Sequence, residues 1–127
     1  PGPNNSLGLI KFLFPNEFNV YLHDTPAQSL FSQSQRDFSH GCIRVQDPLS
    51  LAEFVLRNQD GWTRSSIDSA MHGTKTMRIS VSRPVAVYIL YQTAVVAPEG
   101  IVYFYDDLYG HDARLAQTLA RSRPRVQ

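Results

Sequence analysis

The residues best suited to chemistry lie in one short stretch of the chain. Cys42 is the only cysteine among 127 residues, and its thiolate would be a strong nucleophile. His23 and His40 precede it, and either imidazole could take the thiol proton. An enzyme that transfers an acyl group through a thiol needs a nucleophile, a base and donors for the oxyanion. This stretch therefore offers a candidate nucleophile with a candidate base.

Two further residues could complete such a site. Gly41 has no side chain, so the backbone there can approach a ligand, and successive N–H groups can point at one oxygen. Asp24 directly follows His23 and could orient the imidazole through its side chain or its carbonyl, as the third member of a catalytic triad does.

Each of these residues also has a plainer explanation. A lone cysteine is often a small buried hydrophobe, and a histidine at a strand end is often a hydrogen-bonded polar residue. Two histidines and Cys42 could also hold a zinc with an open position, although no further ligand stands at metal spacing. Spacing alone does not separate His23 from His40 as the base.

The sequence around these residues predicts the strands and helices that must position them, and together these predict a β-rich α+β domain with short helices. Residues 19–23 alternate and predict a strand that ends at His23. Asp47-Pro48 predicts a helix start, and Asp60-Gly61 predicts its end. Ser65 with Asp68 predicts a capping box for a second short helix that closes near Gly73. The predicted apolar face of the first helix is Leu51, Ala52, Val55 and Leu56.

The second half of the chain reads mainly as strands. Residues 76–82 and 85–96 are rich in Val, Ile, Tyr and Thr, and both predict strands. Residues 98–100 predict a hairpin turn into a strand over 101–105, and residues 111–121 predict a terminal helix. So few strands do not close a sheet with two covered faces, which predicts further strands upstream.

Composition narrows the class of protein. With 43% hydrophobic and 18% charged residues, the chain can build one core. A formal charge of +1 argues against a nucleic-acid partner, and the arginines after residue 113 read as a solvated tail. No apolar run approaches the roughly 20 residues of a membrane span. No signal peptide is visible, so a membrane anchor and targeting segments are expected only upstream.

The spacing of the candidate site resembles a known signature. His23, fifteen residues, and then Ser39-His40-Gly41-Cys42-Ile43-Arg44 resemble the motif of the L,D-transpeptidase catalytic (YkuD) domain. The flanks at residues 1–8, 21–26 and 60–62 resemble the long Gram-negative branch. The likeness covers residues 1–109, leaving 110–127 as a terminal helix and basic tail. Family domains have further strands before this region and, in the long branch, a lid. The resemblance therefore implies an L,D-transpeptidase-like sheet lacking its N-terminal strands.

The resemblance implies a peptidoglycan L,D-transpeptidase of the Gram-negative periplasm. Family members attack the tetrapeptide stem at the bond between diaminopimelate and D-Ala. They pass the acyl group to an amine, which forms 3–3 cross-links or links a protein. We expect peptidoglycan stem peptides as partners, carbapenem-type compounds as inhibitors, and no metal or organic cofactor.

The resemblance also implies residue roles. The nucleophile would be Cys42 and the base His23, with Asp24 orienting the base, often through its carbonyl. Backbone N–H groups around His40, Gly41 and Cys42 would form the oxyanion hole, and Ser39, His40 and Arg44 would shape or line the pocket. Two alternatives are a papain-like cell-wall thiol peptidase, whose Cys precedes its His in the chain, and an inactive peptidoglycan-binding fragment.

Overall fold

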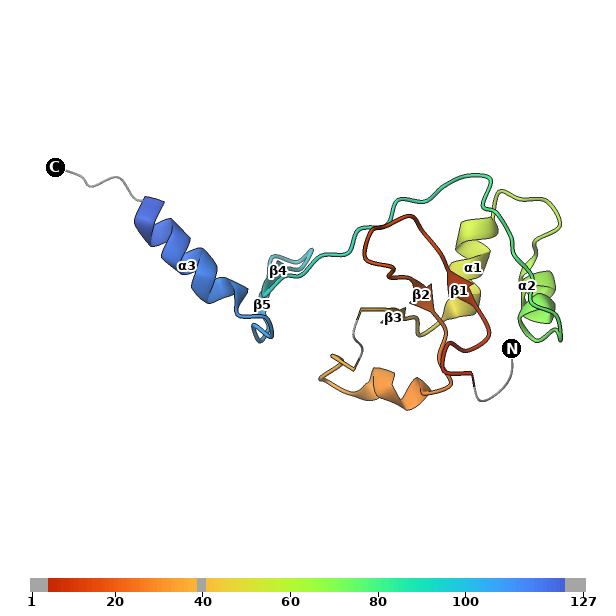
Figure 1. Ribbon diagram of the computed structural model, residues 1–127, viewed down its shortest axis with the longest axis horizontal. Helices are drawn as coiled ribbons and strands as arrows, with labels where there is room; N and C mark the ends of the chain where they lie inside the picture. Colours follow the sequence, from red (N-terminus) through yellow and green to blue (C-terminus); the bar gives the residue numbers. More distant parts are fainter. Residues whose placement is uncertain (1–4, 39–40, 123–127) are drawn as a thin grey trace. The chain divides into compact units, whose positions relative to one another are not determined.

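The computed structural model describes residues 5–38 and 41–122. The chain divides into two compact units, Pro1–Val85 and Ala86–Gln127 (Figure 1). The first unit contains β1 (Lys11–Phe12), β2 (Leu22–His23), the 3-10 helix η1 (Gln28–Ser32), β3 (Ile43–Arg44), α1 (Pro48–Leu56) and α2 (Arg64–Met71). The second contains β4 (Ala94–Val96), β5 (Val102–Phe104) and α3 (His111–Ser122). The α+β class expected from the sequence is confirmed.

The sheet of the first unit has three short strands with β2 at its centre. β2 pairs antiparallel with β1 and parallel with β3. His23 faces Lys11 on one side and Arg44 on the other, whereas Leu22 faces Phe12 and Ile43. Because residues that face each other across strands point to the same side of a sheet, one side is apolar and the other carries the histidine.

The core of the first unit lies between α1 and α2. Ala52, Leu56 and Ile67 are its buried residues. The partly buried residues packed against them are Ile10, Phe12, Leu49, Trp62, Met71 and Ile79. Ile10 and Phe12 come from the β1 region, so the apolar side of the sheet rests on the helices and the histidine side is left facing away from them.

The predicted start of α1 is confirmed. The Ser50 N–H donates to the side chain of Asp47 over 3.0 Å, and Pro48 occupies the first helical position. This hydrogen bond lowers the pKa of Asp47. Ala52 and Leu56, on the predicted apolar face, are buried. The sequence after Arg44 thus anchors β3 directly to the core.

The predicted capping box of the second helix was wrong by two residues. Thr63 Oγ1 accepts from the Ser66 N–H at 3.2 Å, and Ser66 Oγ accepts from the Thr63 N–H at 2.8 Å. Ser66 Oγ also donates to the Gly61 carbonyl over 2.9 Å. A Ser at the third helical position therefore replaces the Glu or Gln of the usual box, and the Ser65–Asp68 pair lies inside the helix.

The strand predicted over residues 76–82 was also wrong. Its backbone instead meets the side chain of Gln59, which donates to the Ser80 carbonyl at 3.3 Å and accepts from the Ser82 N–H at 2.9 Å. Of residues 85–96, only Ala94–Val96 form a strand. Strand propensity alone does not supply a neighbouring strand, and in the described part of the chain residues 76–82 and 85–93 find none.

The second unit contains the predicted hairpin and terminal helix, and both are confirmed. Ala97 and Ile101 close the turn between β4 and β5 with a 2.8 Å hydrogen bond. Asp107 accepts from the N–H groups of His111 and Asp112 at the start of α3 and from the Tyr91 hydroxyl at 2.7 Å. The tyrosine hydrogen bond leads the contacts that lower the pKa of Asp107. No described helix is long and apolar enough to cross a membrane.

Candidate active site

Parallel pairing of β2 and β3 brings the two ends of the predicted site together. The Ile43 N–H donates to the Tyr21 carbonyl at 3.1 Å, and the Val45 N–H donates to the His23 carbonyl at 2.8 Å. Cys42, half-buried, immediately precedes β3. Nineteen positions of sequence separate His23 and Cys42, but their backbones lie on neighbouring strands. The register places Arg44 opposite His23, so Cys42 lies two residues before the position that faces the histidine.

The imidazole of His23 is held by the residue that follows it. His23 is only 5% exposed, and its Nδ1 lies 2.5 Å from the Asp24 carbonyl oxygen. A carbonyl oxygen only accepts hydrogen bonds, so Nδ1 must carry the proton. In the neutral ring Nε2 is then the unprotonated nitrogen. This arrangement leaves a basic nitrogen on a ring whose orientation is set by the backbone.

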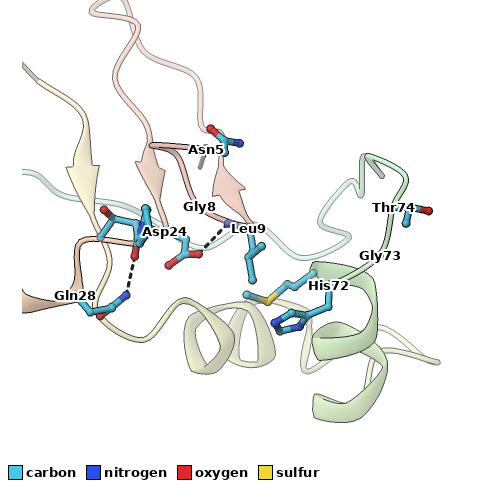
Figure 2. A pocket seen from close by; sticks show the side chains of 11 residues that line it. Asn5, Gly8, Leu9, Asp24, Gln28, His72, Gly73 and Thr74 are labelled. Atoms are coloured by element: carbon cyan, nitrogen blue, oxygen red, sulfur yellow. Dashed lines mark hydrogen bonds between the residues drawn. The ribbon is translucent and has the colours of Figure 1, made fainter. Parts of the chain in front are cut away.

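The side chain of Asp24 has a different task. Its Oδ2 accepts a hydrogen bond from the Leu9 N–H at 2.8 Å, as Figure 2 shows. Asp24 is only 8% exposed. A Cβ at Gly8 would collide with this carboxylate, and Gly8 has a φ of +61°. Asp24 therefore holds the chain leading into β1 with its carboxylate and holds His23 with its carbonyl. Of the two ways in which Asp24 was expected to orient an imidazole, the geometry uses the carbonyl.

Tyr21 is part of the site, although its type and spacing had not marked it. Its hydroxyl is hydrogen-bonded to the Cys42 side chain, and this contact is the first cause that raises the pKa of Tyr21. The charge of the sulfur and burial add to the rise. The Tyr21 and His23 rings meet edge-on with centroids 6.0 Å apart. The signal in the sequence was the two-residue spacing from His23, which places both side chains on one side of a strand.

Gly41 has a backbone that suits only glycine. Its φ is +149°, a value that L residues rarely adopt, while a Cβ there would meet Val20 only at an ordinary 3.4 Å. Conformation, and not lack of space, requires a glycine before Cys42. Ser39 and His40 lie outside the described residues, so the comparison of the two histidines stays a prediction.

Arg44 faces His23 from β3 and is half-buried. An ion pair with Asp24, Asp37 or Asp47 was the alternative to a binding role. Among the described residues, the ion pairs within 4.0 Å are Arg64–Glu53 and His72–Asp68, and neither involves Arg44. Arg44 thus brings an unpaired cation, as far as the described chain goes, to the side of the sheet that carries His23.

An open hollow of about 690 Å³ is lined in part by Asp24 (Figure 2). Its lining includes Leu9, Thr25, Met71 and His72, but neither His23 nor Cys42. It is therefore distinct from the thiol site. In the part of the chain that the structure describes, no three His, Cys, Asp or Glu side chains gather closely enough to hold a metal ion.

Comparison with known proteins identifies the family of the chain. Residues 1–89 match the family model of YkuD, the L,D-transpeptidase catalytic domain. The chain belongs to the L,D-transpeptidase catalytic domain family. A Haemophilus influenzae protein, whose name proposes an L,D-transpeptidase, is 33% identical over 112 residues. This match covers 88% of the chain but only 22% of the H. influenzae protein. The family match includes every residue of the candidate site.

Proposed function

We propose that the chain carries the thiol acyl-transfer site of a peptidoglycan L,D-transpeptidase. Its donor would be the tetrapeptide stem, cleaved between diaminopimelate and D-Ala. The acceptor would be an amine of a second stem, giving a 3–3 cross-link, or an amine of a protein. The location would be the periplasm of a Gram-negative bacterium.

The proposal rests on the hydrogen bond from His23 Nδ1 to the Asp24 carbonyl. The strand that contains His23 is paired with β3, the strand that directly follows Cys42. The hydrogen bond leaves Nε2 of His23 as a base for the thiol. The Tyr21 hydroxyl, bonded to Cys42, adds a donor that can stabilise the thiolate.

In the acylation step, His23 takes the Cys42 proton and the sulfur attacks the diaminopimelate carbonyl carbon. Backbone N–H groups around His40, Gly41 and Cys42 would hold the resulting oxyanion. The C–N bond then breaks as His23 returns the proton to the D-Ala amine, and a thioester remains. Ser39, His40 and Arg44 would shape the pocket that holds the stem.

In the transfer step, the acceptor amine attacks the thioester. The amine loses a proton to His23, the C–S bond breaks, and Cys42 leaves as thiolate with a new amide formed. Charge and atoms balance without an additional reactant. The single base thus serves both half-reactions, which fits a histidine held in one orientation by the backbone.

Intact-mass analysis after exposure to a carbapenem tests this proposal in the full-length protein. Attack on the β-lactam ring should add the mass of one inhibitor molecule, and peptide mapping should place it on Cys42. Cys42→Ala is the matched control and should gain no mass while keeping its circular dichroism spectrum. Unmodified wild-type protein, or an adduct that persists in Cys42→Ala, contradicts the proposal.

A further inference from the structure

Lys11 lies on the same side of the sheet as His23 and has no role in the site described so far. It faces His23 from β1, as Arg44 does from β3. Its ammonium nitrogen lies 5.6 Å from the centroid of the Tyr21 ring, the ring whose hydroxyl bonds to Cys42. A contact of this length is a cation–π interaction, so the lysine is drawn over the site and not away from it.

The charges around Lys11 are not balanced by the described chain. No described carboxylate pairs with Lys11 or with Arg44 within 4.0 Å. The nearest acidic residue in sequence to the base, Asp24, has its carboxylate bonded to the Leu9 N–H. The histidine side of the sheet therefore presents two cations to solvent or substrate, one on each flank of the base.

Their spacing can be estimated from the sheet. Adjacent strands are about 4.8 Å apart, so the backbones of Lys11 and Arg44, two strands apart, are separated by roughly 10 Å with His23 between them. A ligand that fits both cations would carry one anionic group on either side of His23, the base that would act at the bond that Cys42 attacks. A long, flexible lysine and a forked guanidinium can each adjust to a carboxylate at that place.

We propose that Lys11 is a second carboxylate anchor, which with Arg44 brackets the scissile bond of the donor stem. This inference rests on the proposed function, because that donor has a free carboxylate on diaminopimelate and another on D-Ala, on opposite sides of the cleaved amide. Lys11 binds one of the two and Arg44 binds the other. The pair would favour donors with both carboxylates over stems in which either is missing.

The test compares Lys11→Met with wild-type protein on three donors. One is the tetrapeptide with diaminopimelate, one has the D-Ala carboxylate converted to an amide, and one has L-lysine in place of diaminopimelate. With the first donor, Lys11→Met should raise KM about fivefold, as expected for a partly exposed ion pair. With one of the two neutralised donors, wild-type and variant KM should become equal, because the carboxylate that Lys11 binds is gone.

Two control variants distinguish a carboxylate anchor from other roles of Lys11. Lys75→Met removes the same charge from an exposed position elsewhere in the first unit and should leave KM unchanged, and Lys11→Arg should restore most of the affinity. An equal loss on all three donors means that Lys11 supports the thiol or the strand and overturns the anchor. An unchanged KM in Lys11→Met, or an equal rise in KM in Lys75→Met, also overturns the anchor.

Failure of the proposed function gives a different result. In that case the wild-type protein transfers none of the donors and gains no carbapenem mass, and the anchor falls with it. If wild-type protein reacts and Lys11→Met behaves like it on every donor, the transpeptidase proposal stands and the anchor alone is wrong. A circular dichroism spectrum for each variant confirms that the comparison is between folded proteins.

Discussion

The Nδ1 atom of His23 lies 2.5 Å from the carbonyl oxygen of Asp24, the next residue along the chain. The third group of this site is therefore a backbone atom, which no side-chain substitution removes. The carboxylate of Asp24 points elsewhere, to the Leu9 N–H. Orientation of the base and anchoring of the chain before β1 are thus divided between two groups of one residue.

This division predicts that substitutions of Asp24 and His23 affect different properties, stability in the first case and reaction rate in the second. Asp24→Ala removes a buried charged acceptor and should lower the free energy of unfolding by about 1–3 kcal/mol. His23→Ala should lower the rate of Cys42 acylation by about 10²–10⁴-fold, the usual value of a general base. Thermal melts and carbapenem acylation rates measure both effects. An Asp24→Ala protein that is fully stable but as slow as His23→Ala would show that the carboxylate acts on the imidazole.

His23 should matter more than His40 for thiol activation, because a paired strand and the Asp24 carbonyl fix its ring. The pH dependence of Cys42 alkylation by iodoacetamide provides the measurement. His23→Ala should move the midpoint of this profile to higher pH, whereas His40→Ala should move it little. A shift confined to the His40 variant would reverse the two roles.

The pKa of Tyr21 should depend on its contact with Cys42. The Cys42 contact raises the pKa of Tyr21, so Cys42→Ala should return that pKa toward the ordinary tyrosine range. A raised folded-state pKa contributes stability that is present below the unfolded value and lost as pH rises through the folded one. The difference in ultraviolet absorbance between Cys42→Ala and Cys42→Ala/Tyr21→Phe isolates this phenol. If the titration midpoint of Tyr21 is the same when it is measured from wild-type protein and Tyr21→Phe, the contact between Tyr21 and Cys42 is disproved.

Tyr21→Phe should also weaken the site without changing its shape. The substitution removes the hydroxyl that is hydrogen-bonded to the Cys42 side chain. We expect the rate of carbapenem acylation of Cys42 to fall, in the same direction as for His23→Ala but by less. The edge-on ring contact with His23 remains available to phenylalanine, so thermal stability should change little.

Arg44→Lys should raise the apparent KM for the donor peptide with little loss of thermal stability. A guanidinium binds a carboxylate through two parallel hydrogen bonds, which a lysine cannot reproduce. No described carboxylate pairs with Arg44, so a structural ion pair is not lost with it. A fall in melting temperature with unchanged KM would remove Arg44 from the binding site.

Local sequence was enough for several elements and failed for others. The Asp47 cap, the hairpin between β4 and β5 and the helix from His111 all depend on residues within a few positions of each other, and all were predictable. Residues 76–82 have strand-forming side chains but no partner strand, and they bind Gln59 instead. Whether a strand forms depends on a distant segment, which propensity does not encode.

The candidate site divides in the same way. The sequence by itself determined that one thiol, two upstream histidines and a glycine stand at the spacing of the family motif. Only the tertiary structure decided that Asp24 acts through its carbonyl, that Tyr21 reaches Cys42, and that Lys11 and Arg44 flank His23. The contacts of Tyr21, Lys11 and Arg44 follow from the register of three separate strands, and register is set by which sides pack on the α1–α2 core. The carboxylate of Asp24 is held by the Leu9 N–H, fifteen residues away in the chain, and its carbonyl is the group that meets the imidazole.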